Sequence, residues 1–133
     1  MISSDYIIRM IEQIGTMLQR ILKGGSSVEE VYLDDAYMKY LGVNKKLIDR
    51  LTADDIARVL CPSDMSMAAV AAFLLYEDAQ LAALKGDAEK EQEYGRKAYK
   101  LMQHFLAEDP LDDDDLAKLD IDKFDKYAYT EEE

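Results

Sequence analysis

Cysteine and histidine each occur once in the 133 residues, and tryptophan is absent. The lone Cys61 cannot form an intramolecular disulfide bond, which favours the cytoplasm over an oxidising compartment. One histidine supplies few groups that exchange protons near neutral pH. Di-iron sites of helical bundles use Glu-x-x-His pairs on two helices, and they are excluded here because Leu101 stands three residues before His104. We therefore expect no catalytic residue, no metal site and no cofactor.

Basic residues are scarce too. The 16 Lys and Arg face 28 Asp and Glu, giving a net charge of −12. Affinity for a phosphate backbone comes largely from Lys and Arg, so this balance argues against nucleic acid and anionic membranes as partners. The longest uninterrupted apolar run, Met67 to Tyr76, is well short of the roughly 20 residues that span a bilayer. We expect no transmembrane segment and a cytoplasmic protein.

Apolar residues instead recur every three or four positions, which is typical of amphipathic helices. The first stripe comprises Ile7, Ile11, Ile14, Leu18 and Ile21. Two interpretations are open. The stripe packs against the rest of the domain, or its residues Ile7, Ile11, Ile14 and Leu18 pair with a second copy across a two-fold axis to form a homodimer.

Capping residues and glycines divide the rest of the chain into further helices. Ser27, Asn44, Thr52 and Ser63 are the expected N-caps. The helix after Ser63 is Ala-rich and apolar all round, so we expect it at the centre, followed by a Gly-Asp turn and an antiparallel partner. No strand pattern is present. The predicted fold is all-α, a compact bundle of about five to six helices.

The composition changes after Pro110, because residues 111–133 hold ten acidic and three basic side chains. We predict a single helical domain over residues 1–110 and an acidic, partly ordered segment over 111–133. Within that segment Ile121, Phe124 and Ala128 have helical spacing and predict a short docked helix.

Two stretches resemble known families. Residues 75–102, LYEDAQLAALKGDAEKEQEYGRKAYKLM, resemble one tetratricopeptide repeat, with Gly86 and Asp87 at its turn and Ala98 as its packing alanine. The opening, MISSDYIIRMIEQIGTMLQRIL, is similar to the start of a family of short uncharacterised bacterial proteins, a domain of unknown function. The first resemblance implies a helical hairpin; the second implies a bacterial cytoplasmic protein and carries no activity.

Two functions from different classes remain. The first is a non-enzymatic protein–protein interaction module that binds another protein or itself. The second is a small-molecule sensor or enzyme with a pocket between helices. Its walls would be Tyr37, Tyr76, Tyr94 and His104. Cys61 also has two readings, a thiol activated at a helix N-terminus or a small buried hydrophobe.

Overall fold

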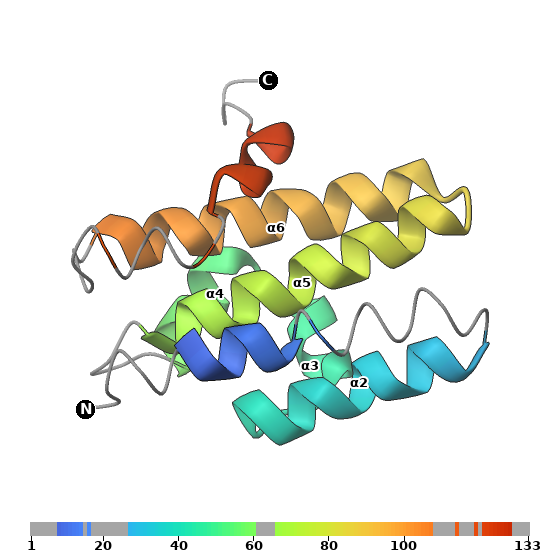
Figure 1. The fold of residues 1–133 in the computed structure, drawn as a ribbon, viewed down its shortest axis with the longest axis horizontal. Helices are drawn as coiled ribbons and strands as arrows, with labels where there is room; N and C mark the ends of the chain where they lie inside the picture. Colours follow the sequence, from blue (N-terminus) through green and yellow to red (C-terminus); the bar gives the residue numbers. More distant parts are fainter. Residues whose placement is uncertain are drawn as a thin grey trace.

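The structure is a computed structural model, and it describes residues 8–14, 16, 27–60, 66–107, 114, 119 and 121–128. In this part of the chain every regular element is a helix, which confirms the predicted all-α bundle (Figure 1). Residues 8–14 are helical. The elements that follow are α2 (Ser27–Leu41), α3 (Lys45–Arg50), α4 (Ala53–Leu60), α5 (Ser66–Leu84), α6 (Ala88–Ala107) and a 3₁₀ helix, η1 (Ile121–Tyr127).

Side-chain caps fix where three of these helices begin. Asn44, Thr52 and Asp87 each accept a hydrogen bond from the backbone N–H three residues later, over 3.0, 3.1 and 3.0 Å respectively. Each bond satisfies a donor that the helix itself leaves unpaired. Gly86, with φ of +79°, takes the left-handed conformation that the turn between α5 and α6 requires. The predicted helical hairpin is therefore present.

Helix α5 lies at the centre, as its composition predicts, between α6 on one side and α2 on the other (Figure 1). Its residues 68–72 are completely buried, and their small side chains let the neighbouring helices approach closely. Among the described residues, the stretch Met67–Leu84 is long and apolar enough to cross a membrane by length and composition, but 72% of it is buried inside the fold. Its place in the core accounts for that apolar character.

The helix over residues 8–14 packs into the same core. Ile11 and Ile14 are buried within the chain. At these two positions the stripe therefore contributes to the interior and presents no surface to a second copy. The other two residues predicted for an interface, Ile7 and Leu18, lie outside the described residues.

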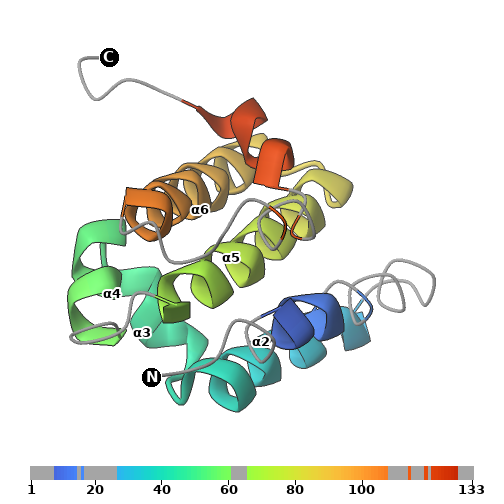
Figure 2. The ribbon, with the colours of Figure 1, turned by 60° about the vertical axis from the view of Figure 1, so that its left-hand side comes forward.

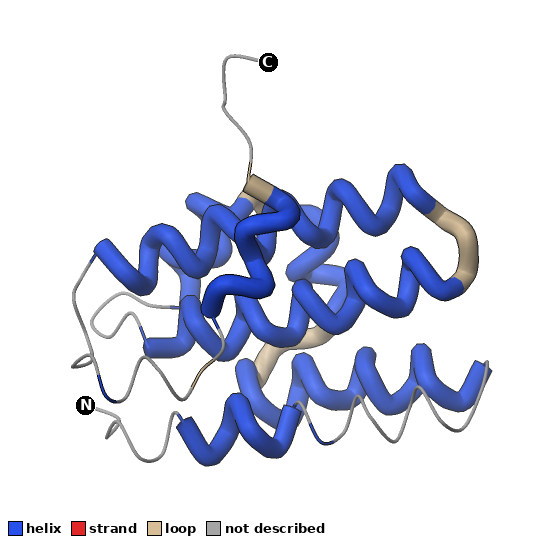
Figure 3. The backbone as a smooth tube through the Cα atoms, turned by 45° about the horizontal axis from the view of Figure 1, so that its top comes forward, coloured by secondary structure: helices blue, strands red, loops and turns tan. Residues whose placement is uncertain are grey.

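Helix η1 crosses the α5–α6 hairpin (Figures 2 and 3). A 3₁₀ helix has three residues per turn, so Ile121, Phe124 and Tyr127 share one face. Phe124 and Tyr127 are buried against the bundle. The sequence predicted docking here, but with α-helical spacing. Ala128, which was expected on the docked face, is exposed, and Tyr127 takes its place because of the tighter winding.

Candidate functional site

Two adjacent carboxylates on α5, Glu77 and Asp78, are buried in the core helix. Their exposed fractions are only 2% and 4%. Buried acidic groups are rare in proteins unless they are paired. Successive residues of an α-helix point about 100° apart, so the two side chains meet different neighbours.

Asp78 has a partner for each carboxylate oxygen, supplied by two other helices. The hydroxyl of Tyr37 in α2 donates a hydrogen bond to Asp78 Oδ2. The ammonium of Lys45 in α3 lies 3.6 Å from Asp78 Oδ1 and 5.1 Å from the ring centroid of Tyr94 in α6. We call these four residues the Asp78 cluster. It ties α2, α3, α5 and α6 together.

Burial and charged partners act in opposite directions on the pKa values of the Asp78 cluster. Burial raises the pKa of Asp78 to about 6, although Lys45 and the Tyr37 hydrogen bond oppose this. Burial and the Asp78 charge raise the pKa of Tyr37 well above its ordinary value. Burial alone would lower the pKa of Lys45, but Asp78 and Tyr94 raise it. A neutral tyrosine and a charged lysine therefore flank the carboxylate.

A pocket of about 330 Å³ opens beside the Asp78 cluster. Its lining includes Asp34, Lys45, Asp78, Leu81, Lys85 and Tyr94. Its charged groups are of both signs, and the pocket is open to solvent on one side. Small-molecule sites are mostly apolar with a few placed polar groups, so this pocket is a less typical ligand site.

Glu77 points into a different environment, beneath residues 121–127, which we call the strap. The ammonium of Lys123 lies 3.9 Å from Glu77 Oε1. It also lies 4.8 Å from the ring centroid of Phe73 and 4.6 Å from that of Tyr76. One carboxylate and two aromatic faces therefore form a cage around a cation from the strap.

The cage satisfies Glu77 incompletely. Oε2 of Glu77 is buried and has no hydrogen-bond partner among the described residues. Burial raises the pKa of Glu77 to about 7, and the positive charges of Lys123 and Lys126 only partly oppose that rise. This carboxyl group therefore titrates near neutral pH, unlike an ordinary surface glutamate.

The other end of the strap is held by the ring of Tyr127. Its hydroxyl donates to Glu91 Oε2 over 2.6 Å and accepts from Gln80 Nε2 over 2.9 Å. The ring lies against Gly95 of α6, where an added Cβ would come within 2.3 Å of a ring carbon. Glycine at this position therefore makes the slot for the ring.

Phe124 fills the space between the cage and the Tyr127 slot. Its ring packs edge-on against Phe73, with centroids 5.0 Å apart and planes at 86°, and lies 5.1 Å from the ring of Tyr76. Such edge-to-face pairs add to the stabilisation from burial alone. We call the surface formed by Phe73, Tyr76, Glu77, Gln80, Glu91 and Gly95 the α5–α6 groove.

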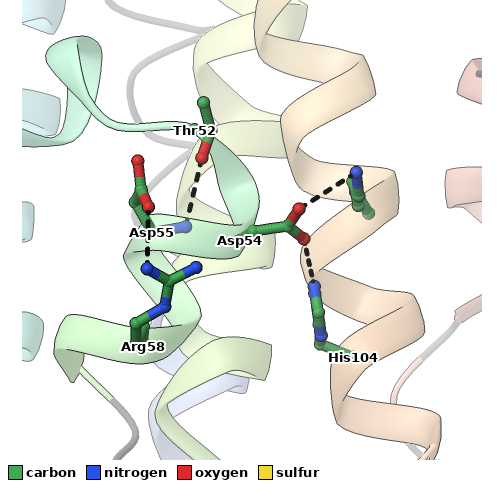
Figure 4. Close-up of polar contacts among 6 residues, drawn as sticks. Thr52, Asp54, Asp55, Arg58 and His104 are labelled. Carbon is green, nitrogen blue, oxygen red and sulfur yellow. Dashed lines mark hydrogen bonds and ion pairs between the residues drawn. The ribbon is translucent and has the colours of Figure 1, made fainter.

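A third polar group links α4 to α6 (Figure 4). His104 Nε2 lies 2.7 Å from Asp54 Oδ1, and Lys100 lies 3.4 Å from Oδ2. The hydrogen bond from His104 lowers the pKa of Asp54. Figure 4 shows the neighbouring Thr52 capping α4 and Asp55 paired with Arg58 on the same helix. The contacts in this view join α4 to α6, cap α4 or lie within α4.

The four residues predicted to wall one pocket lie in three places. Tyr37 and Tyr94 belong to the Asp78 cluster. Tyr76 belongs to the α5–α6 groove, and His104 pairs with Asp54 on α4. Cys61 lies outside the described residues.

Sequence reasoning missed Glu77, Lys123 and Tyr127. Two acidic residues in an otherwise apolar helix were the available signal, because such residues are retained in a core only when something pairs with them. Gly95 in the middle of a helical pattern was a second signal, since glycine there weakens a helix unless a close approach requires it.

Comparisons of the chain with protein-family models, with curated proteins and with solved structures find no match.

Proposed function

We propose that the protein is a non-enzymatic interaction module that binds a short segment of a protein chain in its α5–α6 groove. The observation that carries the proposal is the way the strap is held. Lys123, Phe124 and Tyr127 enter the groove as side chains. A segment of another chain with the same side chains would make the same contacts.

The groove has the features of a recognition surface. The rings of Phe73 and Tyr76 pack against the strap, and the carboxylate of Glu77 lies 3.9 Å from its cation. Aromatic anchors in pockets with a few placed polar groups dominate the energy of protein interfaces. The strap itself is only seven residues long, so a short segment is enough to occupy the groove.

The partner on this proposal is a protein, either a different chain or a second copy of this one. The proposal includes the cytoplasmic location expected from the sequence and an interaction that involves neither nucleic acid nor membranes. It also moves the expected interface away from the first helix, where Ile11 and Ile14 are buried.

The test uses the full chain with Phe124→Ala and Tyr127→Ala, which weaken the strap and leave the groove unchanged. A fluorescent peptide with the sequence of residues 119–128 is added, and binding is followed by anisotropy. We expect saturable binding. The matched control adds Gly95→Ala, whose Cβ would occupy the Tyr127 slot, and it should bind far more weakly. A folded variant that binds no peptide would contradict the proposal.

The pocket beside the Asp78 cluster supports a second candidate, a small-molecule sensor. Two of the predicted wall residues, Tyr37 and Tyr94, lie at or next to it, and Lys45 presents a charged donor there. Screening small polar metabolites by thermal stability tests this candidate. A true ligand should raise the melting temperature of the wild type, and Lys45→Met should remove the effect.

A further inference from the structure

The strap provides no hydrogen-bond donor to Oε2 of Glu77. An ionised carboxylate can accept several hydrogen bonds, and a buried polar atom without a partner is costly. Oε2 has no partner among the described residues although the side chain is 98% removed from solvent. An occupant with more donors at this point would fit the groove better than the strap does.

Lysine is poorly matched to this position. Its Nζ is 3.9 Å from Glu77 Oε1, beyond the roughly 3.2 Å limit of a good hydrogen bond. The ammonium is also held between Phe73 and Tyr76. A guanidinium is planar, stacks on aromatic faces and presents paired donors that match both oxygens of a carboxylate. Arginine would therefore keep the aromatic contacts and also pair with Oε2.

We propose that the α5–α6 groove is a docking site for an arginine-containing segment of a partner protein, and that the strap is its weaker built-in occupant. The arginine takes the place of Lys123, and an aromatic residue four positions later takes the place of Tyr127. This inference rests on the proposed function and specifies its partner.

The charges of the molecule favour the same partner. The chain carries a net charge of −12, which attracts a basic segment from a distance. Within the strap Asp122 and Asp125 offset Lys123 and Lys126. The strap therefore gains nothing from that attraction, whereas a basic segment does.

The experiment compares three peptides on the full chain with Phe124→Ala and Tyr127→Ala. The first has the sequence of residues 119–128, the second replaces the residue equivalent to Lys123 with arginine, and the third replaces the residue equivalent to Lys126. Lys126 is exposed, donates to Gln80 Oε1 over 3.0 Å and lies 5.3 Å from the ring centroid of Tyr76, so the third peptide separates a preference for arginine opposite Glu77 from a preference for arginine elsewhere in the groove.

We expect the second peptide to bind about tenfold more tightly than the first, as an added charge-assisted pair would give. The third should gain much less affinity than the second, because Lys126 bonds to Gln80 and not to Glu77. On a receptor that also carries Glu77→Gln, the preference for arginine should disappear. Equal affinity of the first two peptides would overturn the inference and leave the proposed function standing, whereas failure of all peptides to bind would overturn both.

A second variant keeps the inference testable if the double alanine receptor does not fold. Lys123→Arg in the otherwise unchanged chain places the guanidinium in the cage from within. Amide hydrogen exchange in residues 121–127 should slow by about tenfold relative to the wild type, since local opening then breaks an additional pair. Lys126→Arg should slow the exchange much less, because Lys126 bonds to Gln80 and not to Glu77. Unaltered exchange in Lys123→Arg would contradict the inference.

Discussion

Glu77 and Asp78 are neighbours in sequence and are buried to nearly the same extent, yet their surroundings differ. Asp78 meets a tyrosine hydroxyl and a lysine supplied by α2 and α3. Glu77 meets a lysine from the strap at 3.9 Å, and one of its oxygens has no partner among the described residues. The first carboxylate belongs to the bundle, and the second belongs to a contact with a separate segment.

The difference separates a carboxylate that joins helices of the bundle from one that contacts the strap. A fully paired buried charge holds elements together and is destabilising to break. A half-paired buried charge destabilises the folded chain until a better partner arrives. Substitutions at the two carboxylates should therefore change stability in opposite directions.

Asp78→Ala should give the largest decrease in the free energy of unfolding. It leaves the buried Tyr37 hydroxyl and the Lys45 ammonium without their acceptor, and removal of one partner from a buried pair costs about 3 kcal/mol or more. Urea unfolding measures the change. Asp34→Ala is the matched control, because Asp34 is also 3.7 Å from Lys45 but is half exposed, and exposed pairs contribute at most about 1 kcal/mol. Equal losses in the two variants would contradict the comparison.

Glu77→Gln should stabilise the chain, whereas Asp78→Ala destabilises it. Because the pKa of Glu77 is raised to about 7, its folded form binds a proton more tightly than its unfolded form. The stability that this tighter proton binding provides is fully present below the ordinary pKa of 4.5. It is lost as the pH rises through the folded-state pKa of about 7. Gln mimics the protonated group, so at pH 8 it should stabilise the chain by about 3 kcal/mol.

The gain from Glu77→Gln should shrink towards zero at pH 5, where wild-type Glu77 is itself largely protonated. Urea unfolding at the two pH values measures the change. A variant that is less stable than the wild type at pH 8 would show that Glu77 is adequately paired.

The effect of Gly95→Ala on stability should reverse in sign when the facing residue, Tyr127, is replaced. In the wild type the new Cβ would clash with the Tyr127 ring and release the strap, which rapid amide exchange in residues 121–127 would report. With Tyr127→Ala the slot is empty, and Ala should then stabilise α6 by about 0.5–1 kcal/mol relative to Gly. Identical effects in both backgrounds would mean that the ring does not use the slot.

His104→Gln should have the smallest effect, about 0.5 kcal/mol, because its partner Asp54 is 47% exposed. His104 lowers the pKa of Asp54. The pair therefore contributes above the ordinary pKa of that carboxyl, and its contribution is lost as pH falls below it. Thermal unfolding at pH 7 measures the change. A loss as large as that of Asp78→Ala would place a structural centre at the α4–α6 contact.

The helical fold follows from local signals, and the groove does not. Periodic apolar residues and caps such as Asn44 and Thr52 act within one turn of the chain, so the sequence predicts α3 and α4 closely. The groove joins residues of α5 to strap residues more than 40 positions later, and no local rule links Glu77 to Lys123. The tail spacing indicated docking, but the choice of Tyr127 over Ala128 depends on 3₁₀ winding and on the slot at Gly95.

The four residues predicted to wall one pocket lie in three places for a related reason. These residues are aromatic and lie on three helices: Tyr37, Tyr76, Tyr94 and His104. Residue type alone does not specify which way each side chain points. Tyr37 and Tyr76 lie beside different carboxylates of α5. One meets Asp78 and the other forms the cage beside Glu77.

The carboxyl pKa values of Glu77 and Asp78, measured by ¹³C NMR titration in the wild type and in Lys123→Arg, test the central claim most directly. The account predicts a pKa of about 7 for Glu77 in the wild type. In the variant that pKa should fall, because the guanidinium donates to both oxygens of the charged form. Asp78 should titrate near 6 in both proteins. A Glu77 that titrates at its ordinary value, or identically in the two proteins, would contradict the account.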